Sequence, residues 1–353
     1  MISTILNLLL FVLILGILVF VHELGHFLTA KKSGVHIYEF SIGMGPEIKS
    51  IKGKDGIQYS IRALPLGGYV QMAGEIYEDD DTKKIPKEKF MCNRPWYQRI
   101  IILVAGVFNN FLLAIVLFFV IALIWGAPSL KPVIYDVVED SAAEQAGLQA
   151  GDTITAVNGS KVTTWDKAQL LLLLNDKDNK YEISVKHKNG KKETLTVEPK
   201  TEKTDSGETK VFGIQMKSDV SKGFLPALKY GFQKFVSLVE QMCLTITNLF
   251  TGGLSINSLS GPVGIYTVVG ESRNAGIQSV LFLIAYLSVN LGIMNILPIP
   301  ALDGGHVLFL IIEKIRGKKI DAKIESIVTT VFFGLLLLLM IYVSIHDVIR
   351  FFL

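Results

Sequence analysis

"MISTILNLLLFVLILGILVFVHELGHFLTA" (residues 1–30) joins two patterns that make opposite demands on their surroundings. Residues 3–22 form an apolar run long enough to cross a lipid bilayer. The run leads directly into His22-Glu23-Leu24-Gly25-His26, and ionisable side chains are costly at membrane depth and usually functional there. The segment therefore predicts a membrane helix that carries a reactive polar cluster at its end.

The composition of the chain supports a membrane protein. Half of its 353 residues are hydrophobic, and two further runs, 100–124 and 326–346, are long and apolar enough to span. A fourth, 277–300, also qualifies, although prolines interrupt its end. The first run has no basic start and no small-residue cleavage site, so we expect it to be retained. The net charge of +3 is not that of a nucleic-acid-binding protein.

The segments between the spans differ in character. Residues 35–75 alternate polar with apolar side chains between glycines and prolines, which predicts short strands and hairpins. Residues 126–222 are rich in charge and have the size of a soluble α+β domain inserted between spans. On these grounds the chain divides into segments 1–30, 31–98, 99–125, 126–222, 223–252, 253–312, 313–325 and 326–353.

Residues 225–250 are helical in pattern but do not read as a span. Lys229, Lys234, Glu240 and Gln241 lie mostly away from one apolar face. This pattern predicts an amphipathic helix lying on the membrane surface. The apolar face comprises Leu228, Phe232, Phe235, Val239, Met242, Ile246 and Leu249.

Basic residues set the expected orientation of the spans. Lysine and arginine are frequent in 31–99 and in "EKIRGKKIDAK" (313–323), both next to spans, so both segments should be cytoplasmic. Long inserted domains cross the membrane largely regardless of charge. We therefore expect the N-terminus and the 126–222 insert outside the cytoplasm.

The HExxH pattern at 22–26 is a candidate metal site. On a helix, His22 and His26 lie one turn apart on one face, where both imidazoles can reach one Zn²⁺. Glu23 between them can serve as a general base for a metal-bound water. The alternative is three polar residues at an interfacial helix end.

A catalytic zinc needs a third protein ligand, and "NLGIMNILPIPALDGGH" (290–306) offers Asp303. The alternative role for Asp303 is an Asx-turn or a helix cap beside the two glycines that follow it. With 225–250 on the surface, the first and third spans run in the same direction, and Asp303 reaches the depth of His22 and His26. If 225–250 crossed the membrane, Asp303 would lie on the opposite side, about 20–30 Å away.

The combination of HExxH in the first span, NxxPxPxLDG at the third and an inserted domain before it resembles the site-2 protease family. The likeness is greatest to the bacterial RseP/RasP-type intramembrane zinc metalloproteases with one PDZ domain, and it covers almost the whole chain. It implies a polytopic α-helical membrane protein with four transmembrane helices, a reentrant β-hairpin region and an extracytoplasmic PDZ-like α+β insert. Where that family has AGPxxN, this chain has Ala105-Gly106-Val107-Phe108-Asn109-Asn110, without the proline.

The resemblance also assigns roles to residues. It implies that His22, His26 and Asp303 bind zinc and that Glu23 activates water and later protonates the leaving amine. Asn295 would hold the substrate backbone or stabilise the oxyanion, against the alternative of bonding backbone freed by the nearby prolines. Further substrate-binding candidates are Asn290 and the glycines that match turns of the family's β element, Gly43, Gly45, Gly67 and Gly68.

The insert carries a PDZ-like pattern. "SAAEQAGLQAGDTITAVNG" (141–159) predicts a helix ending at Gly147, a turn at Gly151-Asp152 and a strand that turns Ile154 and Val157 inward. Residues 163–175 predict a second helix capped by Thr164, and 210–216 a strand beside a peptide groove. PDZ domains bind peptide C-termini or unfolded segments by strand addition. The alternative is a spacer that shields the entrance to the site.

We therefore expect a zinc-dependent intramembrane endopeptidase in the bacterial inner membrane. The resemblance implies single-pass membrane protein substrates, such as anti-sigma factors already cut outside the membrane or remnant signal peptides. One alternative is a membrane PDZ scaffold with a vestigial metal site. Another is a metal transporter, but the spans offer almost no ionisable residues beyond this cluster.

Overall fold

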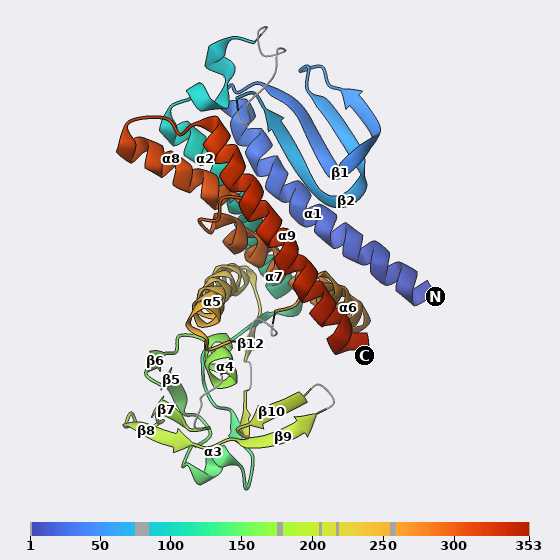
Figure 1. Ribbon diagram of the computed structural model, residues 1–353. Helices are drawn as coiled ribbons and strands as arrows, with labels where there is room; N and C mark the ends of the chain where they lie inside the picture. Colours follow the sequence, from blue (N-terminus) through green and yellow to red (C-terminus); the bar gives the residue numbers. More distant parts are fainter. Residues whose placement is uncertain are drawn as a thin grey trace. The chain divides into compact units, whose positions relative to one another are not determined.

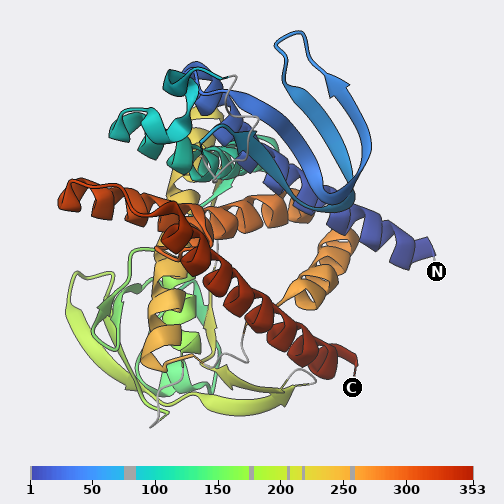
Figure 2. The ribbon, with the colours of Figure 1, turned by 45° about the horizontal axis from the view of Figure 1, so that its top comes forward.

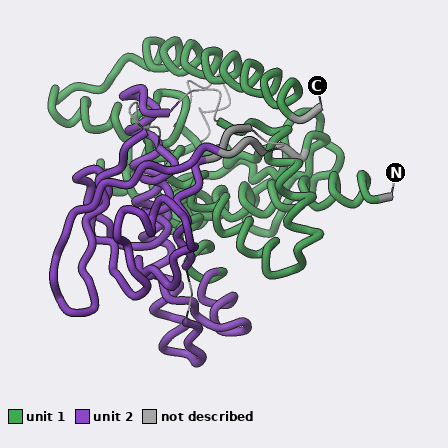
Figure 3. The backbone as a smooth tube through the Cα atoms, turned by 90° about the horizontal axis from the view of Figure 1, so that it is seen from below, with its two compact units in different colours: residues 1–117, 259–353 green, residues 118–258 purple. Residues whose placement is uncertain are grey.

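The computed structural model describes residues 2–74, 85–174, 179–204, 207–216, 219–254 and 259–352. Residues 75–84, within the 31–98 segment, lie outside these ranges. The chain forms two compact units, one made of residues 1–117 and 259–353 and the other of 118–258 (Figure 3). The boundary falls within one long helix, α2, and each unit is described by itself.

The first unit is built on long apolar helices (Figure 1). Four helices among the described residues are long and apolar enough to cross a membrane, as the sequence predicts: α1 (Ile2–Lys32), α2 (Trp96–Trp125), α7 (Ile277–Ile296) and α9 (Ala322–Phe352). At 1.5 Å per residue, the 20 residues of α7 reach about 30 Å, the thickness of the hydrocarbon core. The remaining helices are short: η2 (Lys87–Lys89), η3 (Met91–Asn93), α6 (Pro262–Ala275) and α8 (Asp303–Arg316).

The region predicted to form hairpins is a bent sheet beside α1 (Figures 1 and 2). It consists of β1 (Ile37–Lys52) and β2 (Gln58–Met72), and both strands bend so that each contributes two segments. The pairing places 47–52 against 58–62, then 58–61 against 39–42, then 37–42 against 68–72. Segment 68–72 is thus an outer strand of the sheet, and β2 packs on α1.

Two apolar clusters hold the first unit together. In one, Phe27 and Ala30 of α1 pack with Phe40 and Val70 of the sheet and Ile102 of α2. The other joins α1, α6 and α7. The C-terminal helix α9 is mostly exposed, but its buried Asp347 accepts hydrogen bonds from the backbone N–H groups of Gly261 and Gly264 at 2.9 and 2.8 Å. This carboxylate satisfies orphan donors at the start of α6.

The second unit contains the α/β insert. A four-stranded sheet has the order β6-β5-β7-β8. It packs on α4 around a core that includes Ile154, Trp165, Leu172, Tyr181 and Val197. The elements are β3 (Ala127–Pro128), β4 (Asp136–Val137), α3 (Ala142–Gln145), β5 (Thr153–Val157), β6 (Ser160–Lys161), α4 (Trp165–Leu173), β7 (Tyr181–Lys186), β8 (Lys192–Val197), β9 (Lys200–Thr204), β10 (Gly207–Val211), β11 (Ile214–Gln215) and β12 (Val220–Ser221).

Local predictions for the insert hold in most places. Thr164 caps α4 by accepting a hydrogen bond from the Lys167 N–H at 3.3 Å, and Ile154 and Val157 are buried. The single strand predicted over 210–216 is wrong, because the chain leaves β10 at Val211 and enters β11 at Ile214. Gly213 between them has φ of 80°, and a Cβ there would collide with the Ser141 side chain, so the chain turns at this point.

The amphipathic helix is α5 (Phe224–Thr251), and it belongs to the second unit. Its predicted apolar residues are all exposed or half-buried. Its polar side, by contrast, contacts the insert: Lys234 is buried and its Nζ lies 2.6 Å from the Asp166 carboxylate, while Ser237 hydrogen-bonds both Asp166 and Thr164. The face expected to meet water is therefore the face that holds α5 to α4.

Candidate metal centre and its surroundings

Three potential ligand atoms converge at the end of α1. His22 and His26 follow one another by one helical turn, and their Nε2 atoms lie 3.2 Å apart. The Oδ2 atom of Asp303 lies 3.1 Å from Nε2 of His22 and 3.5 Å from Nε2 of His26. Both histidines are buried, and Asp303 is largely shielded. Among the described residues these three side chains form the group able to hold a metal ion.

The prolines and glycines around Asp303 explain how it arrives there. Helix α7 ends at Ile296, and Pro298 and Pro300 prevent its continuation. Asp303 is the first residue of α8, where its negative charge suits the helix N-terminus. A Cβ on Gly304 or Gly305 would lie within 2.3 Å of backbone oxygens in the preceding turn. Only glycines let the chain turn back closely enough to aim Asp303 at the histidines.

The arrangement fits a tetrahedral metal ion. Zinc–nitrogen and zinc–oxygen distances of about 2.0–2.2 Å place neighbouring ligands of a tetrahedron roughly 3.3–3.5 Å apart. The three observed separations of 3.1, 3.2 and 3.5 Å are close to this value. In addition, Oδ2 of Asp303 is buried without a hydrogen-bond donor. Lone pairs of two neutral imidazoles and a carboxylate repel one another, so this geometry calls for a cation at their centre.

Helix α2 lies against both imidazoles along one face, at Ile102, Gly106 and Asn110. The Nδ1 atom of His26 lies 2.8 Å from the carbonyl oxygen of Ile102, and the Nδ1 atom of His22 lies 3.2 Å from the amide nitrogen of Asn110. Between them, a Cβ on Gly106 would lie 2.3 Å from Nε2 of His26 and 2.7 Å from Cε1 of His22. The sequence analysis assigned no role to Ile102, Gly106 or Asn110, although residues spaced by four lie on one face of a helix.

The sequence profile of peptidase family M50 matches residues 10–339, which is most of the chain. The chain belongs to peptidase family M50. The zinc metalloprotease RasP of Geobacillus kaustophilus is 33% identical, with 100% of this chain and 100% of the relative covered. The regulator of sigma-W protease RasP of Bacillus subtilis is 32% identical, with 97% of this chain and 98% of the relative covered. The protein is thus an intramembrane metalloendopeptidase of the site-2 type.

In this M50 peptidase the bent sheet approaches the HExxH helix at Gly68. A Cβ on Gly68 would lie 3.2 Å from Cγ of Glu23, 3.2 Å from the Val19 side chain and 2.8 Å from the Ser41 carbonyl oxygen. The close approach brings the outer strand of the sheet beside Glu23. Gly43, Gly45 and Gly67 have φ values of 88°, 81° and 88°, a conformation that favours glycine, and they form the bends of β1 and β2.

A polar cluster fixes the shape of this sheet in the M50 peptidase. The Glu39 carboxylate is buried and accepts hydrogen bonds from Arg62 at 2.8 and 3.0 Å and from the Tyr69 hydroxyl at 2.8 Å. Burial alone raises the pKa of Glu39, but the bonds from Ser60, Arg62 and Tyr69 outweigh it and lower that pKa. Burial and the Glu39 charge raise the pKa of Tyr69 to about 12. The cluster ties together segments 39–42, 58–62 and 68–72.

The two asparagines proposed for substrate contact lie on α7. Asn295 is half-buried in the last turn of the helix, before the proline-containing stretch. Asn290 is also half-buried, and its Oδ1 atom is buried without a hydrogen-bond partner. Among the described residues, neither asparagine belongs to the three-residue group that could hold a metal ion.

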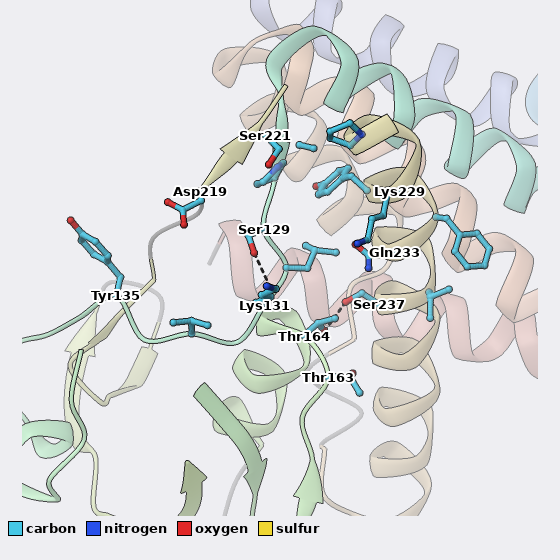
Figure 4. A pocket seen from close by; sticks show the side chains of 18 of the residues that line it. Ser129, Lys131, Tyr135, Thr163, Thr164, Asp219, Ser221, Lys229, Gln233 and Ser237 are labelled. Carbon is cyan, nitrogen blue, oxygen red and sulfur yellow. Dashed lines mark hydrogen bonds between the residues drawn. The ribbon is translucent and has the colours of Figure 1, made fainter. Parts of the chain in front are cut away.

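The second unit of the M50 peptidase contains a cavity of about 1020 Å³ (Figure 4). It lies between the extended segment that carries Ser129 and Lys131 and the face of α5 that carries Lys229 and Gln233. The hydrogen bond between Thr164 and Ser237, 2.9 Å long, lies on its wall. Its lining includes lysines, hydroxyls, the acidic Asp219 and Glu240, and apolar side chains.

Proposed function

We propose that the protein cuts transmembrane segments of single-pass membrane proteins, with zinc held by His22, His26 and Asp303. The metal is zinc, because imidazole nitrogens and a carboxylate oxygen at tetrahedral separations are its common catalytic donor set. The main support for this proposal is that the Nε2 atoms of His22 and His26 and the Oδ2 atom of Asp303 lie within 3.5 Å of one another.

Held by these three residues, zinc would act as a Lewis acid that lowers the pKa of a water molecule and polarises the scissile carbonyl. Glu23 lies on the same helix, one residue after His22, and serves as the base that takes the proton of the attacking water. It then returns that proton to the amine that leaves. Asn295 donates an amide N–H to the substrate backbone or to the oxygen that becomes negative.

Substrate presentation is the role proposed for the bent sheet. A transmembrane helix hides its peptide bonds within its own hydrogen bonding, so it must unwind before cleavage. Segment 68–72 is an outer strand next to Glu23, and an unwound substrate can pair with such an edge. Gly43, Gly45, Gly67 and Gly68 shape this edge, and Asn290 adds a polar contact. We place this region in the membrane, where non-helical backbone is tolerated if it lines a wet cavity.

The insert is proposed to act as a PDZ-like domain on the outer side of the bacterial inner membrane. Its cavity carries Lys131 and Lys229, which suit a peptide carboxylate, and an extended segment that suits an unfolded peptide. The relative from Bacillus subtilis is named for a regulator of sigma-W. Anti-sigma factors already cut outside, or remnant signal peptides, are substrates that fit a site at membrane depth.

The decisive experiment separates the base from the ligands. Glu23→Gln should abolish cleavage of a model single-pass substrate while the purified protein keeps its zinc, because Glu23 is no ligand. Asp303→Ala should lose both zinc and cleavage. Zinc is measured in the purified protein by metal analysis. Full cleavage by the Glu23→Gln variant would refute the proposed function. So would a wild-type protein that binds zinc but cuts no substrate, as a scaffold would.

A further inference from the structure

Asn110 of α2 is a polar side chain with an unexplained environment. It is fully buried, at 0% exposure, and it faces His22 from the turn that follows Gly106. Its amide nitrogen lies 3.2 Å from Nδ1 of His22, while its Oδ1 atom is buried without a hydrogen-bond partner. A buried amide oxygen without a donor is destabilising, so the placement needs a reason.

The tautomer of His22 supplies that reason. The Nε2 atom of His22 faces Nε2 of His26 and Oδ2 of Asp303, so it must present a lone pair there if it binds a metal. A neutral imidazole then carries its proton on Nδ1, which becomes a donor. An amide nitrogen cannot accept that proton, but an amide oxygen can. Oxygen and nitrogen of an asparagine differ little in shape, and a half-turn of the amide exchanges them.

We propose that Asn110 is a positioning residue whose Oδ1 accepts the Nδ1–H of His22 and thereby holds the tautomer and ring direction needed for zinc. The half-turn gives His22 an acceptor and Oδ1 a donor at the same time. Both histidines then have the same tautomer, with the proton on Nδ1, because Nδ1 of His26 already donates to the Ile102 carbonyl oxygen at 2.8 Å. Outer partners of this kind fix metal-ligating histidines.

The backbone around Asn110 is itself held from the opposite side. The Ser288 hydroxyl of α7 donates to the Asn110 carbonyl oxygen at 2.8 Å, and both residues are buried.

The neighbouring Asn109 points elsewhere, since its amide nitrogen donates to the Val21 carbonyl oxygen at 3.2 Å. Asn109 is therefore a matched control, with the same side chain on the same helix but without contact to an imidazole nitrogen.

The proposal rests on His22 being a zinc ligand, and zinc affinity tests it without a substrate. The full chain is purified in detergent, stripped of metal, and titrated with zinc against a chromophoric chelator. Asn110→Leu should weaken zinc binding about 10–100-fold, the usual effect of losing an outer partner. Asn109→Leu should stay within about threefold of the wild type. Unchanged affinity in Asn110→Leu, or an equal loss in Asn109→Leu, would overturn the proposal.

Asn110→Asp decides the question even if the leucine variant does not fold. A carboxylate accepts from Nδ1–H but cannot donate, so this variant should bind zinc within about threefold of the wild type, and its Co²⁺ form should keep the wild-type d–d absorption. A loss as large as that expected for leucine would mean that Asn110 acts as a donor, and would overturn the proposal. His22→Ala serves as reference: full zinc binding in that variant would refute the ligand set of the proposed function instead.

Discussion

At the scale of single residues, the metal centre depends as much on missing side chains as on present ones. Gly25 lies against the Ala105 carbonyl oxygen, 2.3 Å from where its Cβ would be, and Gly106 lies against both imidazoles. These two glycines let α1 and α2 approach closely at the level of His22 and His26. The three candidate ligands, which the structure brings together, could be proposed from HExxH and LDGG, because metal-binding side chains have few other uses at membrane depth. The glycines and Asn110 could not, because their roles arise from contact between helices about 80 residues apart in sequence.

Gly106→Ala should abolish zinc binding while the protein still folds. The added methyl would lie 2.3 Å from Nε2 of His26, so that imidazole must leave its position in the ligand group. Alanine otherwise favours a helix by up to about 1 kcal/mol over glycine. Gly16→Ala on α1, where no atom lies within 4 Å of the new Cβ, is the control and should keep zinc and cleavage. Metal analysis and thermal unfolding of both purified variants would check this, and a zinc-replete Gly106→Ala protein would contradict the arrangement.

At the scale of elements, the sequence predicted the helices more completely than the strands. Span length is dictated by bilayer thickness, so apolar runs located all four candidate membrane helices. The alternation of polar and apolar residues predicted strands within 35–75. It could not reveal the order of the strand segments, in which 39–42 and 58–61 pair in parallel between two antiparallel pairs. That order depends on bends at glycines that are distant in sequence. For α5, periodicity identified two faces, but the polar one contacts α4 rather than water, because Lys234 finds Asp166 as a buried partner.

The Lys234–Asp166 pair should be essential for holding α5 to the insert. Lys234→Met leaves the Asp166 carboxylate with its cation removed in a largely buried place. Breaking a buried pair costs about 3–5 kcal/mol, and the partial exposure of Asp166 puts the expected loss near the lower end. Lys229→Met, which changes an exposed lysine five residues earlier on the same helix, is the control.

Hydrogen exchange of the full-length protein in detergent can measure this effect. Exchange in α4 and the first half of α5 should accelerate in Lys234→Met and remain at wild-type rates in Lys229→Met. The double variant Lys234→Met/Asp166→Leu should recover most of the protection, because it leaves no unpaired charge. Equal protection in all variants would show that α5 is held by its other contacts.

At the scale of the whole molecule, a single metal site places a condition on topology. His22 and His26 lie in the last third of α1, and Asp303 follows the last turn of α7. Their ligand atoms meet, so α1 and α7 must end at the same depth and run in the same direction through the membrane. That requires an odd number of crossings between them, and α2 supplies one. We therefore expect helix α5, which is not among the candidate spans of the described residues, to lie at the membrane surface.

Cysteine labelling in intact cells tests this arrangement. A single cysteine replaces Lys191 in the insert or Lys318 in the loop between α8 and α9, in a chain that lacks Cys92 and Cys243. A maleimide that cannot cross the inner membrane should label Lys191→Cys in intact cells, because the insert is expected outside. It should label Lys318→Cys only after permeabilisation, because this basic loop follows the positive-inside rule. Both positions are exposed, so burial does not obscure the result. If both label from the same side, an additional crossing lies between them, α7 runs in the opposite direction, and Asp303 cannot share a zinc ion with His22 and His26 in the membrane.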